Sequence, residues 1–203
     1  MRRFAVLTFL GILAASCTGA SEVDTSDAAV SAPSTSVSTT TTTTTATTIL
    51  PTFVAGAAGI GDDYYPSLGN GGYDVDHYHL DIAYREDGTV DAAVVITATA
   101  LDNLESFNLD FTGWEIEGLE VNGDTQGYER VDQELVVAPV EILAGEGFEV
   151  EVDYRGTPEP ITSSAIPFGI GWHSGPEGEQ FVAAEPDAAH SWFPSNDHPL
   201  DKS

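Results

Sequence analysis

The chain has 203 residues, of which 33 are acidic and only six are lysine or arginine, so its formal net charge at pH 7 is -27. Such a charge repels nucleic acid phosphates and anionic lipid headgroups, which excludes both as ligands. It suits solubility in a salty medium, where ions screen the repulsion, and a salt-adapted surface and an ordinary acidic secreted surface both stay open.

The N-terminus has the pattern of an export signal. Two arginines precede an apolar run at residues 4–15 that is too short to cross the hydrocarbon core of a bilayer. Small residues then lead into Cys17, the single cysteine, and this junction resembles the lipobox of bacterial lipoproteins, with Ala14 where leucine is usual. We expect residues 1–16 to be a signal peptide and a lipid on Cys17 to anchor the exported chain to the bacterial cell membrane, on its extracellular or periplasmic side. A signal cleaved elsewhere and an uncleaved anchor are the alternatives.

A threonine-rich stretch follows the cysteine. It has few large apolar residues and no period, so it cannot bury enough surface to offset the entropy of ordering it. We therefore predict that residues 17–66 are a lipid-anchored disordered linker with a reach of about 40 Å. A single cysteine allows no intramolecular disulfide, so the domain predicted at residues 67–203 must be held together by its core.

In that domain apolar residues alternate with polar ones, which indicates β-strands. Residues 73–84 and 89–100 form a predicted hairpin around a turn at 85–88. The inward residues expected on its first strand are Tyr78, Leu80, Ile82 and Tyr84. Those expected on its second strand are Val90, Ala92, Val94, Ile96 and Ala98.

Further short alternations follow along the chain. They lie around 107–111, 116–121, 135–137 and 147–156, and in the last of these Phe148, Val150, Val152 and Tyr154 are expected to face inward. Residues 156–179, rich in glycine and proline, are predicted to be a loop, and a short strand begins at 180. No convincing amphipathic helix is present. We therefore predict an all-β fold, an antiparallel β-sandwich or saddle with a solvated acidic face.

The terminal stretch "FVAAEPDAAHSWFPSNDHPLDKS", residues 181–203, resembles the end of the N-terminal domain in the aminopeptidase N family of gluzincin zinc metallopeptidases. Residues 69–84, "GNGGYDVDHYHLDIAY", are similar to the first strand of that domain. Residues 101–123, "LDNLESFNLDFTGWEIEGLEVNG", are similar to the strand pair that follows. The resemblance implies an aminopeptidase N-like N-terminal β domain that is incomplete at its C-terminus.

The resemblance also implies roles for individual residues. In the family an acidic or amide residue on this loop binds the free N-terminal ammonium of a peptide substrate, and Glu185 falls at that position. A carboxylate and an ammonium form a charge-assisted hydrogen bond, which suits an exopeptidase. Ala183 stands where the family often has glutamine. The remaining matched positions are expected to be structural, and they are Trp192, Phe193, Pro194, Asp197 and Pro199.

The catalytic zinc site of that family is missing from this sequence. It needs a His-Glu-x-x-His helix and a downstream glutamate, and no two histidines here have that spacing. His77 and His79 could meet a metal from one strand face, but two imidazoles make an incomplete site. His190 and His198 fare no better. We expect this chain to bind no metal and to be inactive alone, with zinc held by a catalytic domain of the same, longer polypeptide.

The leading hypothesis is therefore the substrate-recognition β domain of a cell-surface zinc aminopeptidase. A non-catalytic, lipid-anchored β module that binds peptide ends or a protein partner is the alternative from another class. An unrelated sandwich, such as a carbohydrate-binding or adhesion module, would leave the motif matches unexplained.

Overall fold

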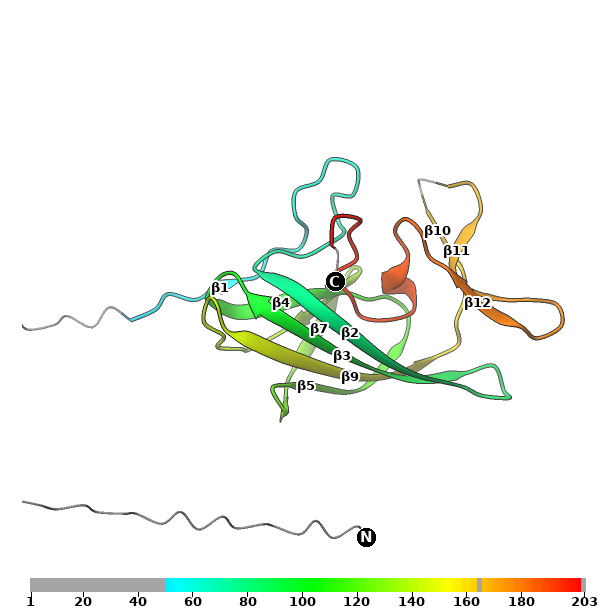
Figure 1. Ribbon diagram of the computed structural model, residues 1–203, viewed down its shortest axis with the longest axis horizontal. Helices are drawn as coiled ribbons and strands as arrows, with labels where there is room; N and C mark the ends of the chain where they lie inside the picture. The colour runs from blue at the N-terminus through cyan, green and yellow to red at the C-terminus, as the bar shows by residue number, and fades with distance from the viewer. Residues whose placement is uncertain (1–49, 164–165, 202–203) are drawn as a thin grey trace, which may run out of the picture. The chain divides into compact units, whose positions relative to one another are not determined.

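The computed structural model describes residues 50–163 and 166–201 (Figure 1). The predicted signal peptide, Cys17 and most of the predicted linker lie outside these residues. The described part consists of strands and one short 3-10 helix, η1 (Ala189–Ser191), with no α-helix. The prediction of an all-β fold is confirmed. No helix in these two ranges has the length and hydrophobicity that a membrane span requires.

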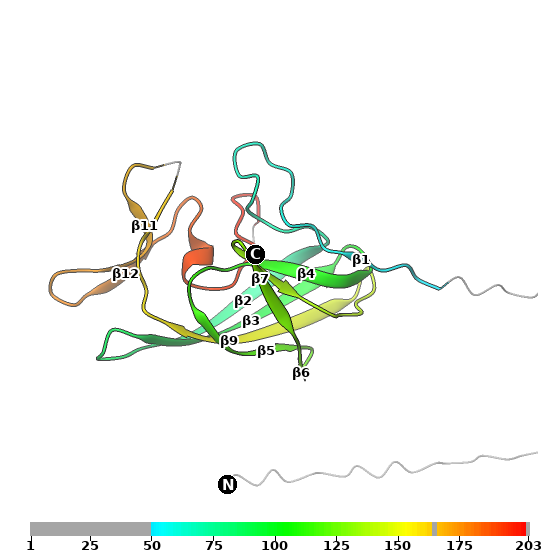
Figure 2. The same cartoon turned by 180° about the vertical axis from the view of Figure 1, so that it is seen from behind.

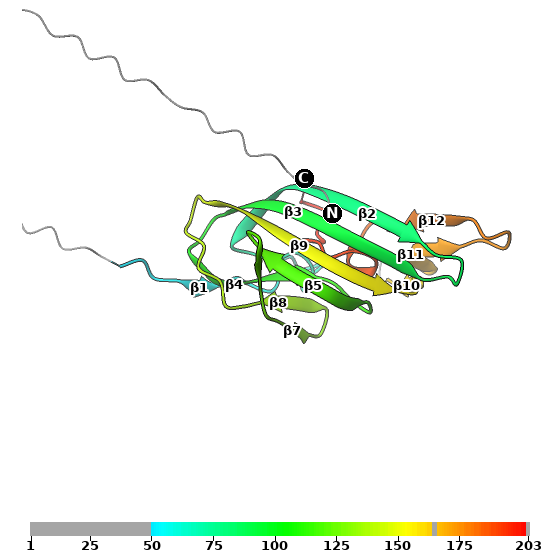
Figure 3. The same ribbon diagram turned by 90° about the horizontal axis from the view of Figure 1, so that it is seen from below.

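The larger layer is a five-stranded antiparallel sheet whose strands lie in the order β2-β3-β9-β5-β6. Figure 3 shows β2, β3, β9 and β5 side by side. Val94 of β3 lies opposite Leu80 of the edge strand β2 on one side and Val152 of β9 on the other, and the register between β2 and β3 shifts once, at a β-bulge between Val75 and His77. The bounds are β2 (Tyr73–Tyr84), β3 (Val90–Ala100), β5 (Glu115–Val121), β6 (Asp124–Thr125) and β9 (Gly147–Gly156).

The second layer is a four-stranded sheet in the order β1-β4-β8-β7. Here β1 runs parallel to β4, while β4, β8 and β7 are antiparallel neighbours. The view from behind shows β4 and β7 in front of the larger sheet (Figure 2). The bounds are β1 (Val54–Ala55), β4 (Leu104–Asp110), β7 (Tyr128–Val131) and β8 (Glu134–Val137).

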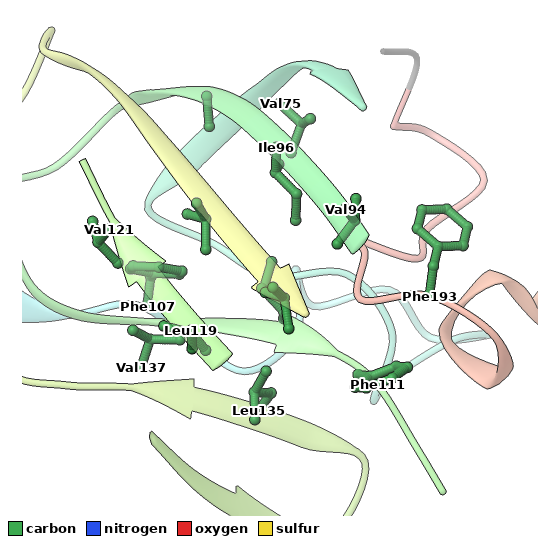
Figure 4. Close-up of a cluster of buried hydrophobic side chains, with 14 of the residues drawn as sticks. Val75, Val94, Ile96, Phe107, Phe111, Leu119, Val121, Leu135, Val137 and Phe193 are labelled. Atoms are coloured by element: carbon green, nitrogen blue, oxygen red, sulfur yellow. The ribbon is translucent and has the colours of Figure 1, made fainter. Parts of the chain in front are cut away.

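The core lies between these two sheets, where side chains from both inner faces interdigitate (Figure 4). Phe107 and Leu135 come from the smaller sheet and meet Ile96 and Leu119 from the larger one. Each such fully buried side chain stabilises the fold by about 1.5–3 kcal/mol. The inward residues predicted for 90–98 and 148–154 are all buried, because the alternation follows the pleat of strands that have a sheet packed on one side.

The predicted inward face of residues 78–84 is only partly correct. Tyr78 and Leu80 are half-buried, but Ile82 is 37% exposed and Tyr84 is 45% exposed. The strand that carries them, β2, lies at the edge of its sheet. Within the described residues nothing covers the far end of β2, so its apolar side chains there stay in contact with water.

The loop predicted at 156–179 is wrong in part, because two strands lie in it. A third sheet has the order β10-β11-β12 and stands at one end of the sandwich (Figure 1). Its strands are β10 (Ile161–Thr162), β11 (Gly169–Ser174) and β12 (Gln180–Ala183). The first is two residues long and the second contains Gly169 and Gly171, so neither shows an alternation that the sequence could reveal.

The folded part also begins earlier than the predicted boundary at residue 66. Strand β1 at 54–55 pairs with β4, and the backbone oxygen of Gly56 accepts a hydrogen bond of 3.0 Å from Asn108 Nδ2. A bridge joins Ala58 to Asn70. These contacts are made mainly by backbone atoms of small residues, which is why hydrophobic patterning gave no sign of them.

Candidate functional site

Glu185 lies in the turn that follows β12. The backbone N–H of Ala188 donates to the carbonyl oxygen of Ala184 at 2.9 Å, which closes this turn around Glu185. The side chain is exposed. Within residues 50–163 and 166–201, no ion pair or hydrogen bond engages its carboxylate. An exposed, unpaired carboxylate on a closed turn is available to a cation from another molecule.

We call residues 184–201 the terminal segment. Asp197 fixes its middle part, because its Oδ2 accepts the backbone N–H of His190 at 2.9 Å and lies 2.6 Å from His190 Nδ1. His190 belongs to η1, and both side chains are buried. The pair therefore ties the short helix after Glu185 to the Asn-Asp-His-Pro turn.

Aromatic packing holds the same segment against the sandwich. The ring of Phe193 meets Tyr78 of β2 edge to face, with 5.5 Å between the ring centroids. Trp192 contacts Phe193 at 4.5 Å and Trp172 of β11 at 6.1 Å. The close-up shows Phe193 on the terminal segment, at the edge of the buried cluster and beside Val94 (Figure 4). Pro194 is buried, and Pro199, further along, is half-buried.

A carboxylate that sequence reasoning missed joins this segment to the smaller sheet. Asp110, at the end of β4, is fully buried, and its Oδ2 accepts the backbone N–H of Asp197 at 2.9 Å. Its backbone also exchanges two hydrogen bonds with Ser195. The same Oδ2 accepts Gly69 N–H at 3.1 Å and Asn70 Nδ2 at 3.0 Å.

The approach at Gly69 is close enough to need glycine. Its φ is +73°, and a Cβ there would meet His198 Cβ at 2.7 Å. The position of Asp110 within the apolar run "FNLDF" could have indicated a buried carboxylate. Nothing in the sequence shows which hydrogen-bond donors surround it.

The cavity beside the terminal segment is polar. It has a volume of about 340 Å³ and lies between the loop at 64–68, the residues at 161–163 and the terminal segment. Asp187 and His190 line it, and the Ser163 hydroxyl donates to Asp187 at 2.9 Å. Glu185 itself is not among the lining residues.

The histidines do not form a metal centre in the described part of the chain. His77 and His79 are exposed on β2, whereas His190 and His198 are buried in the terminal segment. His198 Nε2 lies 3.5 Å from Asp62. Where side chains are described, no three His, Cys, Asp or Glu residues are grouped so that they could hold a metal ion.

Comparisons with known proteins give matches among solved structures. No family model and no curated protein matches the sequence. The M1 zinc metallopeptidase from Deinococcus radiodurans matches with 29% identity and a TM-score of 0.64, over 70% of this chain and 33% of that one. A mutant of this peptidase bound to a Tyr-Ser-Ala substrate matches at 30% identity with the same TM-score and the same coverage.

The fold matches part of an M1 zinc metallopeptidase. This supports the resemblance to zinc metallopeptidases that the terminal stretch suggested. The chain spans about one third of the length of the M1 structures that it matches. The part that it resembles is a non-catalytic portion of those structures.

Proposed function

We propose that this chain supplies the substrate-recognition β domain of a cell-surface zinc aminopeptidase, and that Glu185 binds the N-terminal ammonium of the peptide. The observation that carries the proposal is the match over 70% of the chain to an M1 zinc metallopeptidase that has been solved with a bound tripeptide. The proposal requires a catalytic zinc domain from the same, longer polypeptide.

The geometry around Glu185 supports this role. The carboxylate is exposed and unpaired within the described ranges, and the turn that carries it is tied to the sandwich through η1 and Asp197. A substrate ammonium would therefore meet a charged acceptor whose backbone is already ordered, which lowers the entropic cost of binding. Ala183, on the adjacent strand, offers only a methyl group, so we assign the substrate contact to Glu185 alone.

The chain's own contribution is recognition, and the zinc would supply the activated water that hydrolyses the peptide bond. We expect the purified 203-residue chain to contain no stoichiometric zinc and to release no amino acid from peptides. A longer gene product with a His-Glu-x-x-His helix should hold one zinc per chain and should cleave peptides with a free N-terminus much faster than their N-acetylated forms. Metal analysis and peptide-cleavage assays on both proteins make the test. One tightly held zinc in the 203-residue chain would contradict the proposal.

We also propose that a lipid on Cys17 holds the protein at the outer side of the bacterial cell membrane. The support is the apolar run followed by small residues before the single cysteine. Mass spectrometry of membrane-extracted protein should show a mature chain that begins at Cys17 with a diacylglyceryl group, and Cys17→Ala should release the protein from the membrane fraction. The matched control is Ser16→Ala, which leaves the thiol in place and should stay membrane-bound. A Cys17→Ala variant that remains in the membrane fraction would contradict this proposal.

A further inference from the structure

Two buried carboxyl groups face each other across the smaller sheet. Asp110 of β4 and Glu134 of β8 are register partners, and residues paired in this way have Cβ atoms about 4.5–5.5 Å apart. Asp110 is 0% exposed and Glu134 is 7% exposed. The ion pairs of the described residues include neither of them. Two uncompensated negative charges so close together and so far from water would be very costly.

The hydrogen bonds distinguish the two groups. Asp110 Oδ2 accepts three N–H donors, from Gly69, Asn70 and Asp197, and such donors stabilise an ionised carboxylate. In contrast, Glu134 Oε2 is buried and has no hydrogen-bond partner among the described residues. When the pair carries a single negative charge, these donors favour its location on Asp110.

Asn70 lies beside both carboxyl groups. Its Nδ2 donates to Asp110 at 3.0 Å, its amide lowers the pKa of Glu134, which burial raises, and its Oδ1 is a buried acceptor without a donor in the described structure. A proton on Glu134 turns a second unpaired acceptor into a donor that Asn70 Oδ1 can accept. One proton thus satisfies two buried oxygen atoms that are otherwise unpaired.

Several charged and titratable groups on neighbouring elements surround the pair. On β7, Arg130 donates to the carbonyl oxygens of Phe111 and Trp114 at 2.9 and 2.5 Å and takes no part in the pair. Burial, followed by the Glu134 charge, raises the pKa of Asp110 to about 7, and burial raises the pKa of Glu134. The other groups near the pair are Asp197, His190, Tyr73, Tyr78 and Asp201.

We propose that the Asp110–Glu134 pair is a proton-binding site whose two carboxyl groups share one proton, and that loss of this proton weakens the attachment of the terminal segment to β4. Deprotonation puts a second negative charge beside Asp110, close to the carboxylate of Asp197. The terminal segment is bound through Asp110 at both Ser195 and Asp197, so release of this segment is the direct way to relieve the repulsion.

The direction of the pH dependence follows from the raised pKa values. A carboxyl group with a higher pKa in the folded chain than in the unfolded chain binds more protons when folded, so stability falls as the pH rises through that range. From about pH 5 to pH 7 the unfolding constant should increase by up to about tenfold per pH unit from this site. Above the folded pKa the loss is complete.

The test compares Glu134→Gln with the unmodified 203-residue chain in urea unfolding at pH 5 and pH 8. The variant removes the titrating group but keeps its shape. At pH 5 it should be about as stable as the unmodified chain. At pH 8 its unfolding constant should be at least tenfold smaller than that of the unmodified chain. The matched control is Glu129→Gln on the exposed neighbouring strand β7, which should change stability by the same small amount at both pH values. A Glu134→Gln chain that gains nothing at pH 8 relative to pH 5 would overturn the proposal.

A second measurement needs no variant. Amide hydrogen exchange at Ser195 and Asp197, corrected for the intrinsic pH effect, should lose protection between pH 6 and pH 8, while amides of β3 and β9 keep theirs. Infrared spectra should show the band of a protonated buried carboxyl group at pH 6 that disappears by pH 8. Constant protection together with no such band would exclude the site even if Glu134→Gln failed to fold.

Discussion

Replacement of Glu185 by alanine should lower kcat/KM for peptides with a free N-terminus by roughly 10- to 200-fold in the longer enzyme that the proposed function requires. A hydrogen bond between a carboxylate and an ammonium contributes about 1.5–3 kcal/mol, and each 1.4 kcal/mol corresponds to about tenfold in rate. Zinc content should not change, because Glu185 lies outside any metal shell. Glu185→Gln, which keeps an acceptor but loses the charge, should give an intermediate effect.

N-acetylated peptides provide the substrate control for this prediction. They have no ammonium to bind, so their slow turnover should be nearly the same before and after the substitution. The protein control is Glu177→Ala, since Glu177 is also exposed and lies in the turn between β11 and β12. The quantity to measure is the ratio of free to acetylated turnover. If Glu185→Ala left this ratio unchanged, the carboxylate would be a solvated surface group and the recognition role would be lost.

Phe193→Ala should destabilise the folded domain by about 3 kcal/mol, the lower end of the range for removal of a buried phenylalanine ring. Phe193 is 9% exposed and packs on Tyr78, so its loss opens a cavity between the terminal segment and β2. Urea unfolding followed by tryptophan fluorescence measures the change, with Trp192 as a neighbouring reporter. The midpoint should fall while the slope stays the same.

Leu200→Ala is the matched control, because Leu200 belongs to the same segment but is 72% exposed. Its effect should stay within about 0.5 kcal/mol. A loss below about 1 kcal/mol for Phe193→Ala would mean that the terminal segment is not packed on the sandwich as described. In that case the turn that carries Glu185 would also lack its support.

The sequence predicted the central strands correctly as β structure. Alternation at 90–98 and 148–154 was readable because each strand has one face on the core, so every second side chain had to be apolar. Strand β7 was missed because all four of its residues are exposed and no alternation marks them. The position of Glu185 on an ordered turn could be expected only from the resemblance of the terminal stretch to a known family.

The cluster of polar groups around Asp110 could not be predicted from any pattern in the sequence. Its hydrogen-bond partners Asn70 and Asp197 are 40 and 87 residues away along the chain, and Glu134 joins them from another strand. Periodicity reports which face of a strand is buried, because that depends on neighbours in sequence. Which polar groups meet inside depends on how the two sheets and the terminal segment pack. The amino-acid order alone therefore determined the central strands and the acidic surface, whereas only the tertiary structure brought these carboxyl groups together.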